Sequence, residues 1–235
     1  VSLGFPDFAT KITERILRFY PDQKERAQII QAEILVARRK FEDAEKLAAS
    51  LPDDSPRTRA IRLAIANGYF AVGNNEKAKE LYTQFFKRIG DQAPDDPDLK
   101  RFYMEAAYKF AQMQQYAGDL EGAVRGYENV LKADPEETVE RRVKADLAEL
   151  YVDLADEKPD QRDDYLERAR ALCEDVQWGG MDMLSGQTVT TMAHIEMVRG
   201  RDDEARKVLN DYMDVLKRID EILKEQDADM SLSPM

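Results

Sequence analysis

The stretch YAGDLEGAVRGYENVLKADPEE, residues Tyr116–Glu137, contains the pattern on which the fold prediction depends. The pair Gly118–Asp119 is typical of a turn that leads directly into a helix, because glycine accepts left-handed backbone angles and aspartate caps a first helical turn. Ala123 follows one turn inside the predicted helix, and the larger Tyr127 comes four residues later. Pro135 then marks the exit, since the residue before a proline is biased away from helix.

The same order of turn, alanine and larger residue recurs along the chain. It is found in FEDAEKLAASLPDDSP, NNEKAKELYTQFFKRIG, YLERARALCEDV and GRDDEARKVLNDYM, and FPDFATKITERILRFYP fits the same template. The aligned alanines are Ala9, Ala44, Ala78, Ala123, Ala169 and Ala205. Helical periodicity is present nearly everywhere and alternating strand patterns are absent, so we expect an all-α protein.

The spacing of these alanines predicts a repeat of about 34 residues with two longer copies. Ala9 and Ala44 are 35 residues apart, and Ala44 and Ala78 are 34 apart, whereas the next two intervals are 45 and 46 residues. Eleven extra residues are about three helical turns, so longer helices would keep the apolar faces in phase. A long loop is the alternative. The unbroken apolar stripe between Leu99 and Phe110 favours longer helices.

A helix-turn-helix unit of 34 residues resembles the tetratricopeptide repeat family. The best copies are Arg57–Gly90 and Met104–Pro135. The matching small, tyrosine and aromatic positions are Ala66, Tyr69, Ala78 and Tyr82 in the first copy, and Ala111, Ala123, Tyr127 and Pro135 in the second, where Gln114 replaces the expected tyrosine. The resemblance implies a right-handed α-α superhelix of about five helical hairpins that ends in a long C-terminal helix, from Asp203 to about Gln226.

This reading predicts a single helical repeat domain over residues 1–227. Its units are a half unit at 1–21, full units at 22–56, 57–98, 99–135, 136–181 and 182–227, and a disordered tail at 228–235. The half unit matches only a second helix, so its first helix is expected upstream of Val1. We therefore expect self-association through the exposed apolar side of that half unit, which includes Phe8 and Ile12, and a C-terminal end kept free by its charges.

The charge balance argues against nucleic acid as a partner. Acids outnumber bases by 47 to 35, giving a formal net charge of −12, and the bases are scattered among the acids. The longest stretch without a formal charge, Met183–Ile195, is too short to span a membrane, so no membrane insertion is expected in this segment. The single Cys173 cannot form an internal disulfide, and both a cytoplasmic protein and one exported by a signal upstream of this chain remain open.

The sequence offers little material for catalysis. Cys173 and His194 are the only residues of their kinds, and the resemblance places the thiol between helices and the imidazole on the groove. There is no zinc or calcium spacing and no phosphate-binding glycine motif. We therefore predict no enzyme activity, no catalytic residue, no metal and no cofactor.

The resemblance implies instead a concave groove lined by the first helices of successive units. The partner-binding residues that it assigns are Glu33, Leu63, Asn67, Phe70, Tyr108, Gln112, Gln115, Glu149, His194 and Met197. Of the carboxylate clamp by which some members hold chaperone C-termini, only Asn67 is present, so a protein or peptide segment with basic and apolar side chains fits better. The predicted function is a non-catalytic scaffold for protein–protein interaction. The alternatives are a regulatory or accessory domain of a larger protein whose catalytic or membrane part lies outside this chain, and a structural element that associates through its ends.

Overall fold

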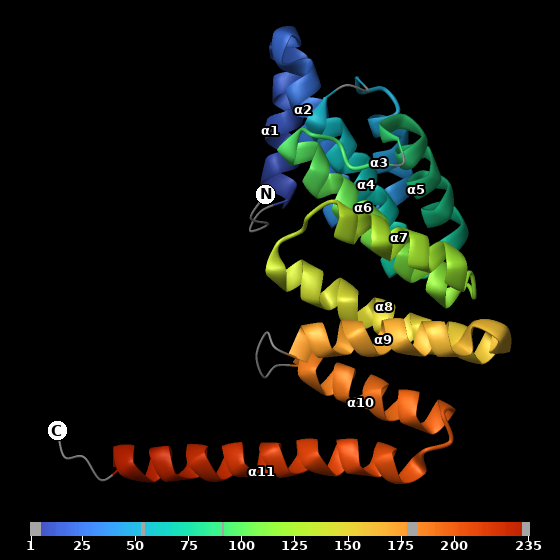
Figure 1. The fold of residues 1–235 in the computed structure, drawn as a ribbon. Helices are drawn as coiled ribbons and strands as arrows, with labels where there is room; N and C mark the ends of the chain where they lie inside the picture. Colours follow the sequence, from blue (N-terminus) through green and yellow to red (C-terminus); the bar gives the residue numbers. More distant parts are fainter. Residues whose placement is uncertain (1–5, 53–54, 91, 178–182, 232–235) are drawn as a thin grey trace. The chain divides into compact units, whose positions relative to one another are not determined.

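The computed structural model describes residues 6–52, 55–90, 92–177 and 183–231. Within these ranges the chain forms helices joined by short connections, with no β-strand, which confirms the all-α prediction. The helices gather into two compact units, residues 1–135 and 136–235. The division falls where the sequence predicts one repeat to end and the next to begin, and the two units are described separately (Figure 1).

Unit 1 is a stack of antiparallel helices. It contains α1 (Pro6–Phe19), a 3₁₀ turn at Pro21–Gln23, α2 (Lys24–Ala37), α3 (Phe41–Ala48), α4 (Pro56–Ala71), α5 (Asn75–Ile89), α6 (Pro97–Tyr116) and α7 (Leu120–Lys132).

The first helix of each pair in unit 1 packs on the first helix of the next pair. Contacts join α2 to α4 and α4 to α6, while α3 contacts both α2 and α4, and α5 contacts both α4 and α6. The first helices α2, α4 and α6 therefore form one layer of this unit, and the second helices α3, α5 and α7 lie against it.

Unit 2 repeats this arrangement. It contains α8 (Glu137–Glu157), a 3₁₀ turn at Pro159–Gln161, α9 (Arg162–Gln177), α10 (Met183–Val198) and α11 (Asp202–Ser231). Here α8 contacts α9 and α10, and α10 also contacts α9 and α11. Within unit 2, α8 and α10 are thus the first helices and α9 and α11 the second helices.

The turns between paired helices have the geometry that their sequences predict. Gly73, Gly118 and Gly200 all have φ between 73° and 79°, a region that favours glycine. The next residue then caps the helix in two of these turns. The Asn74 side chain accepts from the backbone N–H of Lys77 at 3.2 Å, and the Asp119 side chain accepts from that of Gly122 at 2.9 Å.

The aligned alanines are contact points between helices. Ala44, Ala78, Ala123 and Ala169 are 0% exposed and Ala205 is 4% exposed, while the side chain of Ala9 lies outside the described residues. A methyl group at these positions lets a neighbouring helix approach closely. The repeat read from the sequence is therefore the spacing of the helix crossings.

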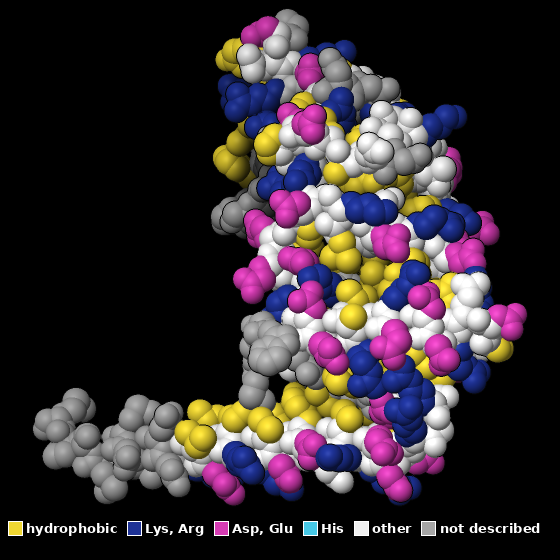
Figure 2. Space-filling model, in the orientation of Figure 1, with side chains coloured by type: hydrophobic (Ala, Val, Ile, Leu, Met, Phe, Trp, Pro, Cys, Tyr) yellow, Lys and Arg dark blue, Asp and Glu magenta, His cyan; other side chains and the backbone are white. Residues whose placement is uncertain are grey.

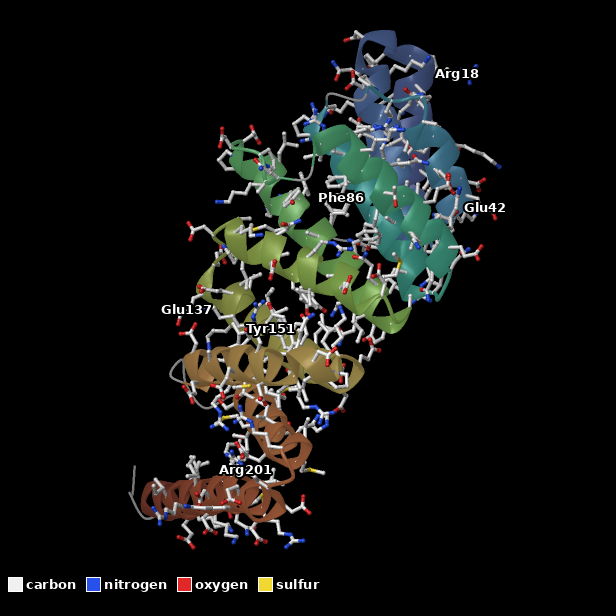
Figure 3. The ribbon with its side chains drawn as sticks, turned by 45° about the vertical axis from the view of Figure 1, so that its right-hand side comes forward. Arg18, Glu42, Phe86, Glu137, Tyr151 and Arg201 are labelled. Carbon is white, nitrogen blue, oxygen red and sulfur yellow. The ribbon has the colours of Figure 1, made fainter. Side chains whose placement is uncertain are left out.

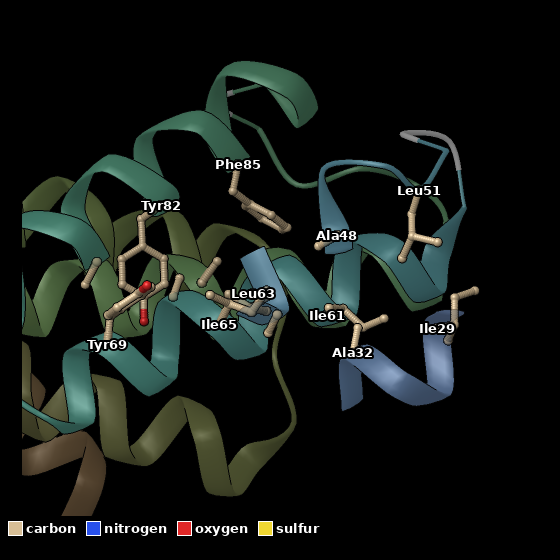
Figure 4. Packing of buried hydrophobic residues seen from close by; sticks show 14 of the residues in the cluster. Ile29, Ala32, Ala48, Leu51, Ile61, Leu63, Ile65, Tyr69, Tyr82 and Phe85 are labelled. Carbon is tan, nitrogen blue, oxygen red and sulfur yellow. The ribbon is translucent and has the colours of Figure 1, made fainter. Parts of the chain in front are cut away.

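Aromatic rings fill the space beside these crossings in unit 1. Tyr82 and Tyr69 point toward each other from α5 and α4, with Phe85 farther along the same core (Figure 4). Phe86 contacts two further rings, with its centroid 5.7 Å from those of both Tyr103 and Phe110. This cluster joins α4, α5 and α6 into one hydrophobic core.

The two long intervals in the repeat are accommodated by longer helices of both kinds. Among the second helices, α5 has 15 residues and α7 has 13, against 8 in α3. α6 has 20 residues and α8 has 21, against 14 in α2 and 16 in α4 and α10. Tyr103, Ala106 and Ala107 of α6 are buried, as the apolar stripe predicts.

The C-terminal helix differs from its prediction in two respects. α11 continues to Ser231, so residues 228–231, expected to be disordered, are helical. Its charges also do not surround it completely. Hydrophobic side chains follow one side of α11 (Figure 2), and Ile222 and Leu223 are 52% and 54% exposed. The expectation that charges surround the closing helix is therefore corrected, because exposed apolar residues spaced three and four positions apart separate the charged residues along one side.

We expect Ala123→Leu to lower the stability of unit 1 by about 1–3 kcal/mol, since a larger side chain must enter a fully packed helix crossing. Urea unfolding followed by circular dichroism measures this change. Ala71→Leu, at the exposed last residue of α4, is the matched control and should change stability little. Equal effects of the two substitutions would contradict the assignment of Ala123 as a contact point.

Candidate functional site

The first-helix face of unit 1 is formed by side chains of α2, α4 and α6 that the packing leaves at least partly accessible. Asn67 on α4 connects three helices there. Its amide donates to a carboxylate oxygen of Glu105 on α6 at 2.6 Å, and its carbonyl oxygen accepts from the hydroxyl of Tyr82 on α5. Burial of Tyr82, together with the nearby charge of Glu105, raises the pKa of its phenol, which keeps it a hydrogen-bond donor. These bonds hold Asn67 and Glu105 in a fixed arrangement.

Aromatic side chains lie on the same face. Phe70 on α4 stacks with Tyr116 at the end of α6, with ring centroids 6.3 Å apart, and Tyr116 is 77% exposed. Tyr108 on α6 is half-buried and packs on Tyr127 of α7 at 5.8 Å. The Lys109 ammonium group lies 5.6 Å from the centre of the Tyr108 ring. The face therefore offers ring surface beside polar groups.

Two amides complete this face on α6. Gln112 donates to the Tyr108 hydroxyl at 3.1 Å, and Gln115 accepts from the Tyr127 hydroxyl at 3.1 Å. Because second-helix tyrosines orient Asn67 and Gln115, these amides are positioned before any partner binds. Such preorganisation lowers the entropy lost on binding.

Leu63 and Glu33, both assigned to the groove from the sequence, differ in burial. Leu63 is 2% exposed and belongs to the hydrophobic core, so its assignment to a binding surface is corrected. It lies on α4, which packs on α2, α3, α5 and α6 and keeps only a narrow sector open. Glu33 on α2 is half-buried and keeps part of its surface in solvent.

The first-helix face of unit 2 is formed by α8 and α10 and is more acidic. Gln187 on α10 donates to carboxylate oxygens of Asp146 and Glu149 on α8, at 3.1 and 3.2 Å. Farther along, Asp153 is half-buried, whereas His194 and Met197 on α10 are exposed. Burial raises the pKa of the Asp153 carboxyl, and Glu149 raises it further, while His194 opposes this. Asp146, Glu149 and Asp153 thus place three carboxylates on one helix, and the His194 imidazole lies close enough to Asp153 to influence the pKa of its carboxyl.

Cys173 and His194 occupy different environments in unit 2. Cys173 on α9 is fully buried, and burial raises the pKa of its thiol to about 12, so it stays protonated at neutral pH. His194 is exposed on α10. A protonated, buried thiol is a poor nucleophile. No group of three or more potential metal ligands occurs in the described ranges.

A cluster of charged side chains in unit 2 joins α9 to α10. Glu196 on α10 is 5% exposed and is approached by the guanidinium groups of Arg170 on α9, of Arg199, and of Arg201 (labelled in Figure 3). The Arg201 Nη1 atom lies 3.5 Å from one carboxylate oxygen. A buried carboxylate with several cationic partners fixes how α9 and the α10–α11 turn meet.

Sequence reasoning missed several residues of these faces. Tyr116, Asp146 and Asp153 were not assigned, although Asp146, Glu149 and Asp153 follow one another at three- and four-residue spacing on α8. Following steps of three and four residues along each first helix from an assigned groove residue leads to these missed residues. Tyr116 continues the row of Tyr108 and Gln112 in the same way.

Among the helices that the structure describes, none combines the length and the apolar character that a membrane span needs.

Comparison with known proteins connects this geometry to a fold. Similar solved structures include the nearly identical TPR-like repeats of a Podosopora anserina protein assigned as a kinesin light chain, with 19% identity and a TM-score of 0.58 over 84% of this chain and 97% of that one. A variant of those repeats gives 17% identity and a TM-score of 0.61 over 85% and 97%. BtubC (BKLC) of P. vanneervenii gives 19% identity and a TM-score of 0.60 over 92% and 89%.

This chain has a TPR-like fold. The resemblance seen in the repeat spacing is thereby confirmed at the level of structure. No protein-family model and no curated protein matches the sequence significantly. Within the TPR-like fold, α2, α4, α6, α8 and α10 are the first helices of the hairpins, so the two faces described above are the surfaces on which the groove residues were expected.

We expect Asp153→Asn to raise the thermal stability at pH 7. The raised pKa means that the folded state disfavours the ionised carboxylate, so a neutral amide removes a cost that begins as the pH rises above the pKa of the unfolded chain and is complete above the pKa of the folded protein. The gain should shrink as the pH falls toward 4, where the carboxyl becomes protonated. Thermal melts of both proteins across this range measure it. The exposed Asp156→Asn is the control, with a smaller gain, and a gain for Asp153→Asn that is independent of pH would contradict the assignment.

Proposed function

We propose that this chain is a protein-interaction scaffold that holds a partner segment on its first-helix faces. The observation that carries the proposal is the gathering of acids and amides on the first helices of both units, joined by accessible aromatic rings in unit 1. Glu105, Tyr108 and Tyr116 represent them in unit 1, and Glu149 and Asp153 in unit 2. The TPR-like fold is typical of such scaffolds, which supports the proposal at the level of fold.

The partner that fits these faces carries basic and apolar side chains. Carboxylates of Glu33, Glu105, Glu149 and Asp153 would attract lysine and arginine. The stacked Phe70–Tyr116 pair offers an apolar surface for a large side chain, and its exposed ring can also lie against a guanidinium group. The fixed amides of Asn67 and Gln115 can bond the backbone of an extended segment.

The proposal predicts that Tyr116→Ala and Glu105→Lys weaken partner binding while leaving the fold intact, since both side chains are exposed. The measurement is the binding of the purified chain to a peptide array that varies charge and hydrophobicity. We expect enrichment of sequences that combine Lys or Arg with Leu or Phe, reduced by each substitution and by added salt.

Glu80→Lys, an exposed charge reversal on α5 away from this face, is the matched control and should leave the array pattern unchanged. If basic apolar peptides are not enriched, or if the enrichment survives both face substitutions, the proposal is wrong. Circular dichroism of each variant separates loss of binding from loss of folding.

We further propose that copies of this chain associate through α1. Large apolar side chains of this helix are exposed, with Phe8 at 65%, Ile12 at 42% and Phe19 at 60%. They share a sector with the half-buried Ile16. Covering an apolar sector of this kind with another molecule is favourable, because it removes apolar surface from water.

Sedimentation velocity tests this association. The wild-type chain should sediment as an oligomer at high concentration, and Phe8→Glu combined with Ile12→Lys should shift it to a monomer, because charges then occupy the contact. Ile222→Glu combined with Leu223→Lys on α11 is the matched control. If only the α11 substitutions produce monomers, or if the wild-type chain is monomeric throughout, association through α1 is excluded.

A further inference from the structure

A hollow lies in unit 1, on the side of the second helices. It is a cavity of about 670 Å³ between α5 and α7, here called the α5–α7 slot. Its floor is formed by Tyr103, Ala107 and Phe110 of α6, and Phe86 of α5 closes one side. This volume falls within the range of pockets that hold ligands or anchoring side chains.

The floor of the slot is aromatic and preformed. Tyr103 is 1% exposed, whereas Phe86 and Phe110 are half-buried and present ring surface to the slot. Phe86, labelled in Figure 3, lies 5.7 Å from both other rings, measured between centroids. Because Phe86 contacts both other rings, the floor does not need to rearrange to accept an apolar group.

Close packing of α7 on α6 shapes the opposite wall. Gly122 and Gly126 of α7 lie along the slot. A Cβ atom at Gly126 would approach the Cβ of Ala111 to 2.7 Å, so only glycine permits this approach of the two helices. With no side chain at Gly126, this wall stays low and the floor remains accessible there, whereas the Gln114 amide and the Asp119 carboxylate occupy the space beside Gly122.

The charged residues at the edge of the slot, here called its rim, are positive, whereas the chain as a whole is negative. Lys87 of α5 and Arg125 of α7 line the slot, and no Asp or Glu is among the described residues that do so. Both cations are exposed, and neither forms an ion pair with another described side chain. Thr83 and Asn129 add neutral hydrogen-bonding groups. In a protein with a formal net charge of −12, this is a local site for a negatively charged group.

We propose that the α5–α7 slot binds a short acidic peptide segment that carries one large apolar side chain. The apolar side chain enters the slot and packs on Phe86 and Phe110, and flanking carboxylates pair with Lys87 and Arg125. This surface is distinct from the first-helix faces and selects the opposite charge, so one copy of the scaffold can hold two segments of different chemistry.

Isothermal titration calorimetry with defined peptides tests the proposal. The probe is acetyl-Asp-Asp-Phe-Asp-Asp-amide, compared with a peptide that has Ala in place of Phe and with one that has Lys in place of each Asp. Only the first should bind measurably. Lys87→Glu combined with Arg125→Glu should weaken its binding by roughly tenfold, because two exposed attractions become repulsions. Thr83→Trp should also weaken it by filling the slot without a change of charge.

Two matched controls locate the binding. Lys79→Glu, an exposed charge reversal on α5 outside the slot, and Tyr116→Ala on the first-helix face should both leave the affinity unchanged. The proposal is overturned if the Lys-containing peptide binds as well as the acidic one, if removal of Phe has no effect, or if Tyr116→Ala removes binding. Circular dichroism confirms that each variant is folded, and the result is independent of whether the first-helix faces bind basic segments.

Discussion

Two helices can pack at short distance only where one of them presents a small side chain at the crossing, and this constraint repeats along the chain. Ala44, Ala78, Ala123 and Ala169 are all fully buried at such crossings. Gly126 is an extreme case, because even one added carbon atom would collide with Ala111. The aromatic core, the first-helix layer of each unit and the low wall of the α5–α7 slot all depend on this close approach.

The fold was largely predictable from sequence because the constraint is local and periodic. Turns at Gly73 and Gly118, the alanines that follow them and the stripe on α6 each leave a pattern within one helix. The faces were less predictable. Leu63 and Asn67 lie one turn apart on α4, yet the first is in the core and the second is on the surface. A first helix is packed on several sides, so exposure depends on neighbours that the pattern of a single helix does not contain.

The distribution of charge is likewise only partly predictable from the sequence. The net charge describes the chain as acidic, and the first-helix faces agree with it through Glu105, Glu149 and Asp153. Lys87 and Arg125, however, come from two helices far apart in sequence and meet only because α5 and α7 flank the same part of α6. Scattered bases can therefore form a cationic rim, which counting along the chain does not detect. The slot was accordingly absent from the sequence-based assignments.

The longer helices also bear on how such chains can change in length. α5 is seven residues longer than α3 and α6 is four residues longer than α4, which are about two turns and one turn, so the positions that meet neighbouring helices keep their angular phase. An insertion of eleven residues returns a helix almost to its starting angle, whereas one of nine would rotate the contact alanines by about half a turn. Insertions and deletions within a helix are therefore tolerated only when they preserve its helical phase. Repeats of unequal length can coexist in one stack, provided that their differences are close to whole numbers of turns.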